Sequence, residues 1–91
     1  MEIWEVLGVD TQATEKNKTT GEVVAGVKYY LAGDNFDSAI DGRDRFLGRC
    51  VSVLFLSNAD REKFRYDAMP GDQIRVGYNR WGRVSLFEAV F

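Results

Sequence analysis

The 91-residue sequence predicts an all-β fold with one short helix, arranged as a small five-stranded barrel in a single domain, residues 1–91. Residues 21–32 and 73–78 alternate between apolar and polar side chains, which is the period of a half-buried strand. Residues 1–9 are apolar on both faces, as expected for a strand that lies between two packed surfaces. No long crossover helix is indicated, so neighbouring strands are expected to pair as local antiparallel hairpins.

The N-terminal part, residues 1–20, is expected to contain one strand followed by a polar loop. Residues 1–9 place Ile3, Leu7 and Val9 on one face and Trp4 and Val6 on the other. Gly8 is a natural position for a bulge. Residues 10–20 are predicted to form a loop or a frayed hairpin tip. Lys16-Asn17-Lys18 suits phosphate binding there, and an ordinary solvated loop is the alternative because Glu15 lies beside the lysines.

The second strand, residues 21–32, has one unbroken apolar face made of Val23, Ala25, Val27, Tyr29 and Leu31. Lys28 and Tyr30 point to the opposite face. An aromatic ring beside a cation on an outward face suits a ligand platform, and cross-strand packing is the other interpretation.

Residues 34–48 are expected to form a long connection, and residues 49–56 the third strand. The alternation in this strand predicts Val51, Val53 and Phe55 inward, with Leu54 and Leu56 on the other face. Leu54 and Leu56 then need a cover, either the following segment or a second copy of the chain, so a homodimer is expected.

A short helix is predicted to start at Ser57, because Ser followed by Asp60 three residues later is an N-capping pattern. Pro70-Gly71-Asp72 then introduces the fourth strand, residues 73–78. Asn79 and Gly82 suit the first and fourth positions of a type I turn, with Gly82 free to adopt positive φ. The last strand covers residues 83–91.

Five strands with a helix between the third and fourth are the element order of an OB-like barrel, and an SH3-like barrel is the nearest rival.

Composition argues against several kinds of function. The sequence contains no histidine and one cysteine, which excludes common structural zinc sites and histidine-dependent triads. No enzymatic activity, metal or other cofactor is therefore expected. No apolar run reaches the length of about 20 residues that a membrane helix needs, so no membrane partner is expected. The N-terminus lacks a basic signal-peptide region, and the single Cys50 is consistent with a cytoplasmic protein.

The net charge of −2 is unevenly distributed. Residues 1–42 carry three basic and eight acidic side chains, and residues 43–83 carry nine basic and five acidic ones. A basic half on an acidic protein can attract a polyanion. Interleaved surface ion pairs are the alternative.

The tyrosine-bearing strand Gly26-Val27-Lys28-Tyr29-Tyr30-Leu31 and the closing hairpin, residues 70–90, resemble those of the small single-stranded-DNA-binding proteins of filamentous phages and related replicons. In that family, basic side chains and exposed aromatics bind the strand, and dimers form through β-hairpins. The resemblance implies a role in DNA replication. It also implies that the binding residues are Lys28, Tyr30, Arg75, Arg80, Trp81 and Arg83. The acidic net charge and the long stretch at residues 34–48 depart from the family pattern.

The tip of the last hairpin leaves two functions open. Arg80, Trp81 and Arg83 offer one aromatic plane between two cations, which suits base stacking and phosphate contacts in single-stranded DNA or RNA. Arginine and tryptophan are also enriched in protein hot spots. Residues 79–83 are therefore also compatible with a protein-interaction or oligomerisation module. The arrangement of these side chains around a groove distinguishes the two.

Overall fold

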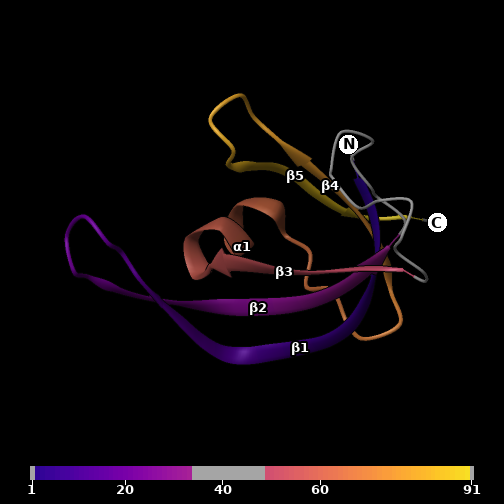
Figure 1. Cartoon of the computed structure of the whole chain (residues 1–91), viewed down its shortest axis with the longest axis horizontal. Helices are drawn as coiled ribbons and strands as arrows, with labels where there is room; N and C mark the ends of the chain where they lie inside the picture. Colours follow the sequence, from indigo (N-terminus) through magenta and orange to yellow (C-terminus); the bar gives the residue numbers. More distant parts are fainter. Residues whose placement is uncertain (1, 34–48, 91) are drawn as a thin grey trace.

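The computed structural model describes residues 2–33 and 49–90, so the predicted connection at residues 34–48 lies outside the described residues. The elements along the chain are β1 (Glu2–Lys16), β2 (Val23–Gly33), β3 (Cys50–Ser57), α1 (Asn58–Phe64), β4 (Gln73–Tyr78) and β5 (Val84–Ala89). Figure 1 shows the strands curving around the short helix. For the residues that the structure describes, the prediction of an all-β fold with one helix between the third and fourth strands is confirmed.

The strands form one antiparallel sheet in the order β3-β2-β1-β4-β5. The long strand β1 is central, because it pairs with β2 along most of its length and with β4 through Glu2 to Glu5. A five-stranded antiparallel sheet of this kind is consistent with the partly open OB-like barrel. Within the described sheet, β3 and β5 are the edges and the barrel is not closed between them.

Strand β1 is longer than the sequence predicts. The expected loop at residues 10–20 is wrong for its first part, because Asp10 to Lys16 continue β1 and pair with β2. Most side chains of this stretch are exposed, so it lacks the alternation that marks a strand with one buried face. The predicted irregularity at Gly8 is confirmed by a register shift between Val6 and Gly8.

The core lies on the concave side of the sheet. Its main members are Trp4, Val6, Val27, Tyr29, Leu31, Leu56, Ala68, Ile74, Val76 and Phe87. The predicted burial of Val27, Ile74 and Val76 is confirmed, while the predicted burial of Val23 and Val53 is wrong, since they are 63% and 52% exposed. Val23 pairs with Lys16 at the far end of the β1–β2 hairpin, beyond the reach of the core.

The faces of β3 are the reverse of those predicted. Leu56 lies opposite the buried Val27 and is 1% exposed, whereas Val51 is 66% exposed. Both faces of this uncharged strand carry large apolar side chains, so alternation alone could not orient it. The reversal removes the predicted homodimer surface at Leu54 and Leu56, because Leu56 belongs to the core and Leu54 packs against it.

Helix α1 begins where the capping pattern predicts. The Ser57 Oγ accepts a hydrogen bond from the Asp60 backbone N–H at 3.2 Å. The helix ends at Arg65, whose left-handed backbone (φ 54°) lets its N–H donate to the Arg61 carbonyl at 3.0 Å. Phe64 attaches the helix to the core through Phe87, with ring centroids 6.2 Å apart.

Among the described residues, no helix has the length and apolar character needed to span a membrane.

Candidate nucleic-acid interface

The tip of the β4–β5 hairpin is a turn closed by backbone and side-chain hydrogen bonds. The Gly82 N–H donates to the Asn79 carbonyl at 3.0 Å, and Gly82 has a φ of 80°, as predicted. The Asn79 Oδ1 accepts hydrogen bonds from the backbone N–H groups of Trp81 and Arg83 at 2.9 and 3.0 Å. Because these hydrogen bonds define the turn without a ligand, binding there would require little further ordering of the backbone.

Trp81 projects from this tip and is 71% exposed. The Arg80 guanidinium carbon lies 4.4 Å from the centroid of its ring, which is a cation–π contact. The two side chains therefore form a stacked pair that presents an aromatic surface beside a positive charge.

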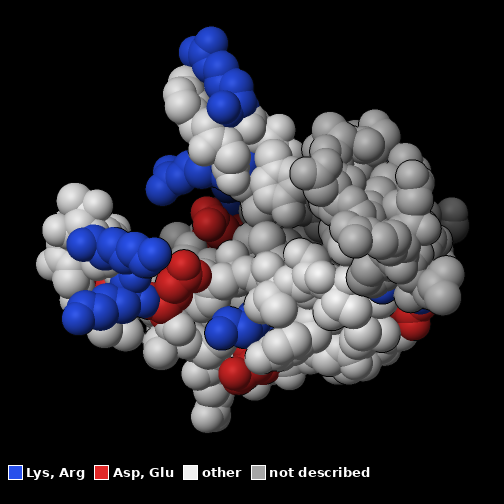
Figure 2. Space-filling view, in the orientation of Figure 1, with Lys and Arg blue, Asp and Glu red and all other residues white. Residues whose placement is uncertain are grey.

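The tip of the β1–β2 hairpin is also ordered. The Asn17 Oδ1 accepts from the backbone N–H groups of Thr19 and Thr20, and the Gly21 N–H donates to the Asn17 carbonyl at 2.8 Å. This turn carries Lys16 and Lys18. Figure 2 shows basic side chains gathered on both hairpin tips, with acidic side chains between them.

A groove lies between the two hairpins. Its larger hollow has a volume of about 500 Å³ and is lined mainly by residues of β3, α1 and the β4–β5 hairpin. An adjoining hollow of about 290 Å³ extends to the tip of the β1–β2 hairpin. The cations along the two hollows are Lys16, Lys63 and Arg83. The groove thus combines charge from three separate elements.

Phe55 of β3 is the aromatic residue at the centre of this surface. It lines both hollows of the groove and a third hollow of about 520 Å³ that contains Lys28. Gly26 makes this position possible, because a Cβ there would lie 2.7 Å from the Phe55 Cζ and would overlap the Leu56 carbonyl oxygen. The Phe55 ring therefore lies over the backbone of β2 and is half-buried.

Two carboxylates share the groove. Glu15 and Asp60 line both hollows, against the three cations named above. Asp60 is placed there by the start of α1, where its backbone N–H is bound to the Ser57 cap. The groove is therefore only weakly positive, which lowers the affinity to be expected for a polyanion.

The six predicted binding residues do not form one site. Arg80, Trp81 and Arg83 lie together on the hairpin tip, and Arg83 also lines the groove. Lys28 reaches the same surface through the hollow beside Phe55.

Tyr30 and Arg75 line neither hollow of the groove. Tyr30 is 42% exposed on the outer face of the sheet, where it lies opposite Val53 and Gly8. Arg75 donates to Glu88 at 3.0 Å on the outer face of β4, so its charge is already paired. The residue types singled out the hairpin tip, but they did not indicate which strand face each side chain occupies.

The groove also contains residues that the sequence did not indicate. Phe55 was predicted to face the core, and no signal in its apolar strand contradicts that prediction. Tyr78 and Lys63 were not assigned a role, although both line the larger hollow. Lys16 did carry a signal, since Lys16-Asn17-Lys18 was recognised as a possible phosphate-binding stretch.

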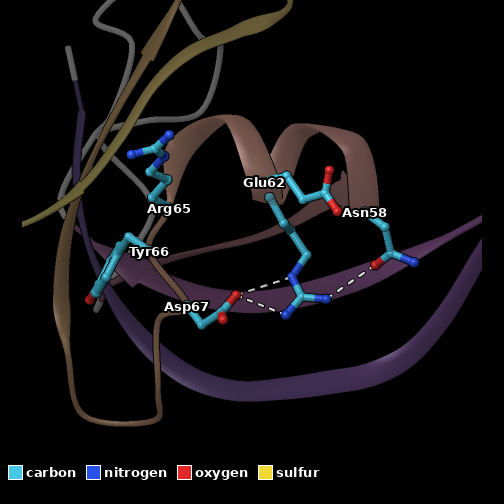
Figure 3. A pocket seen from close by; sticks show the side chains of 6 residues that line it. Asn58, Glu62, Arg65, Tyr66 and Asp67 are labelled. Carbon is cyan, nitrogen blue, oxygen red and sulfur yellow. Dashed lines mark hydrogen bonds and ion pairs between the residues drawn. The ribbon is translucent and has the colours of Figure 1, made fainter.

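A further hollow of about 640 Å³ lies beside α1 (Figure 3). The interactions of its side chains stabilise the fold. The Arg61 guanidinium donates to the Asp67 carboxylate at 2.8 and 3.2 Å and to the Asn58 Oδ1 at 3.1 Å. The hydrogen bond with Asp67 raises the pKa of Arg61. This cation therefore ties the helix to the segment that follows it and is already occupied by partners. In the described part of the chain, no group of three or more His, Cys, Asp or Glu side chains is placed to hold a metal ion.

Comparisons of the chain with protein-family models, curated proteins and solved structures found no match.

Proposed function

We propose that this protein binds single-stranded DNA or RNA, without catalysis, in the groove between the tips of the β1–β2 and β4–β5 hairpins. The observation that carries this proposal is the position of Phe55, a half-buried aromatic ring in a groove with cation-bearing hairpins on both sides. In OB-like barrels, the face of the second and third strands and the loops of these same two hairpins are the usual place for oligonucleotides.

The binding energy would come from two sources. Bases stacked on Phe55 and Trp81 would contribute about 1–3 kcal/mol each. Phosphates would contact the cations of the groove and the hairpin tips, mainly Lys16, Lys18 and Arg83, with release of counterions. Since Glu15 and Asp60 oppose this attraction, binding is expected to be moderate and strongly salt-dependent.

The resemblance to the single-stranded-DNA-binding proteins of filamentous phages and related replicons supports the same proposal. It suggests DNA rather than RNA as the ligand, and a cytoplasmic role in replication. Of the binding residues that the resemblance implies, Arg83 lines the groove, and Arg80 and Trp81 lie on the same hairpin tip.

A protein-interaction module is the second candidate. It is favoured by the near balance of charge in the groove and by the exposure of Trp81 on a hydrogen-bonded hairpin tip. A tryptophan stacked with an arginine is a common anchor in a partner's pocket.

Titration of the protein with a dT oligonucleotide at low salt tests the proposal. Tryptophan fluorescence should be quenched through Trp81, because Trp4 is buried in the core. Trp81→Ala should weaken binding by about 1–3 kcal/mol, a loss of roughly 5- to 150-fold. If the folded wild-type protein does not bind at low salt, the proposal is wrong and the protein-interaction candidate replaces it.

Arginine variants test the role of charge in the same titration. Removing one phosphate contact should lower the slope of log affinity against log salt by about 0.7, so Arg83→Ala and Arg80→Ala should each approach that value. Arg75→Ala is the matched control, because its guanidinium is paired with Glu88 away from the groove. A slope that changes equally in all three variants would point to net charge instead of local contacts.

A further inference from the structure

The two carboxylates of the groove are not paired with the cations beside them. Glu15 and Asp60 line both hollows, together with the three cations of the groove. Among the described residues, ion pairs join charges at other places, as in the pair of Arg75 with Glu88, but none joins Glu15 or Asp60 to a cation. Both carboxylates are therefore available to accept hydrogen bonds from a ligand.

Two ordered elements hold these carboxylates at the groove. The Asp60 backbone N–H donates to the Ser57 Oγ at 3.2 Å, which fixes the first turn of α1. The Asp60 carboxylate itself has no hydrogen-bond donor among the described residues. Glu15 lies on β1, where it pairs with Val24 of β2. The groove thus has two acceptors in place before a ligand binds.

The same hollows contain the ring on which a base would stack. Phe55 lines both of them, beside Glu15 and Asp60. A base that stacks on this ring has its edge directed sideways, toward the walls of the hollow. Because the smaller hollow has a volume of only about 290 Å³, the carboxylates in its wall lie within reach of that edge. Stacking tolerates every base, so any selection among bases must come from contacts with the edge.

The chemistry of a carboxylate distinguishes the four bases. An ionised carboxylate can only accept hydrogen bonds. Guanine presents two neighbouring donors, N1–H and the 2-amino group, which match the two oxygens of one carboxylate. Cytosine and adenine each present one amino group beside a ring nitrogen that is an acceptor. Thymine presents one N–H between two carbonyl oxygens, which repel the second carboxylate oxygen. Guanine is therefore the base that fits these acceptors best.

We infer that Glu15 and Asp60 accept hydrogen bonds from guanine and so make the groove selective for single strands that contain guanine. This inference rests on the proposed function, because it requires a strand in the groove. The cations contact the phosphates of any strand, and the carboxylates oppose those phosphates while they select the base. The cost in general affinity is thus linked to a gain in specificity.

A comparison of guanine with hypoxanthine tests the inference on the wild-type protein. One oligonucleotide contains thymines with isolated guanines, and the second has deoxyinosine at the same positions, which removes only the 2-amino group. In fluorescence anisotropy, the guanine strand should bind more tightly by roughly five- to tenfold. This ratio should not change with salt, because both strands carry the same phosphates. Equal affinities would overturn the inference.

Carboxylate variants show which side chains select the base. Asp60→Asn and Glu15→Gln should each lower the ratio of guanine to inosine affinity by roughly threefold, and the double variant should bring it close to one. Glu62→Gln is the matched control, because Glu62 lines the hollow beside Arg61 and should leave the ratio unchanged. A preference that persists in the double variant, or that falls equally in Glu62→Gln, would also overturn the inference.

The outcome is distinguishable from a failure of the proposed function. If guanine, inosine and thymine strands all bind equally well, the groove binds single strands without selecting guanine, and only the inference is wrong. If the folded protein binds none of them at low salt, both the inference and the proposed function are wrong.

Discussion

Phe55 is the residue on which the proposed binding site depends most. Replacing it with leucine keeps apolar bulk above Gly26 but removes the flat ring on which a base can stack. Phe55→Leu should therefore weaken binding to a dT oligonucleotide by about 1–3 kcal/mol, measured by fluorescence anisotropy. Phe64→Leu is the control, because Phe64 packs inside against Phe87. Equal losses in both variants would mean that altered packing, not stacking, weakens binding.

Tyr66 and Asp72 form a pair that should make stability depend on pH. The Tyr66 hydroxyl donates to the Asp72 Oδ2 at 2.8 Å, and the Met69 N–H donates to the same oxygen at 2.9 Å. Burial, together with the bond to Asp72, raises the pKa of Tyr66 to about 12. The N–H of Met69, together with the Tyr66 hydroxyl, lowers the pKa of Asp72.

The signs of these shifts predict the direction of the change at each end of the pH range. The folded protein keeps the Tyr66 proton where the unfolded chain has lost it, so this contribution to stability is full below pH 10 and is lost as pH rises toward about 12. The Asp72 contribution is present above its ordinary pKa of 3.8 and is lost as pH falls through its lowered value. Urea midpoints of the wild type and of Tyr66→Phe should converge as pH rises from 10 to 12. Parallel curves would show that the hydroxyl does not carry the alkaline effect.

At the scale of elements, the pairing of β2 with β3 depends on the close approach at Gly26. A methyl group there would overlap the Leu56 carbonyl oxygen and press on the Phe55 ring. Gly26→Ala should destabilise the fold by about 1–3 kcal/mol in urea denaturation, the usual cost of overpacking. Gly8→Ala should cost much less, because a Cβ at Gly8 has its nearest contact 4.0 Å away. If both variants are equally stable, β2 and β3 are farther apart in solution than the structure indicates.

The elements also show what local sequence can predict. The Ser57 cap, the Gly82 turn and the strands with one apolar face, such as residues 73–78, were predicted because their signals arise within a few residues. The extension of β1 to Lys16 was missed because that stretch is largely exposed on both faces and is ordered by pairing with β2. The faces of β3 are decided by its register with β2, a contact between distant parts of the chain.

At the scale of the whole molecule, too, the sequence could predict only those parts of the site whose residues are close together along the chain. The sequence identified Arg80, Trp81 and Arg83 as a unit because they are adjacent in one turn. It could not place Phe55 beside the groove, or remove Arg75 from it, since both depend on which face of a strand points outward. It also could not show that Glu15 and Asp60 lie among the cations. A site built across three elements is a property of the assembled sheet.

The placement of these carboxylates gives a test of the whole charge arrangement. The chain has a net charge of −2, so a polyanion is attracted by the local groove rather than by the molecule as a whole. Asp60→Asn should raise affinity for a dT oligonucleotide about two- to five-fold at low salt, because it removes one negative charge near the bound phosphates. The gain should fade as salt screens the charge.

Glu62→Gln is the matched control for this variant. It makes the same change in net charge two residues along α1, but Glu62 lines the hollow beside Arg61 instead of the groove. Circular dichroism should confirm that both variants remain folded, since Asp60 also lies in the first turn of the helix. If Glu62→Gln strengthens binding as much as Asp60→Asn, the attraction depends on net charge and the ligand does not occupy the groove. If only Asp60→Asn does so, the phosphates lie near the start of α1, between the two hairpin tips.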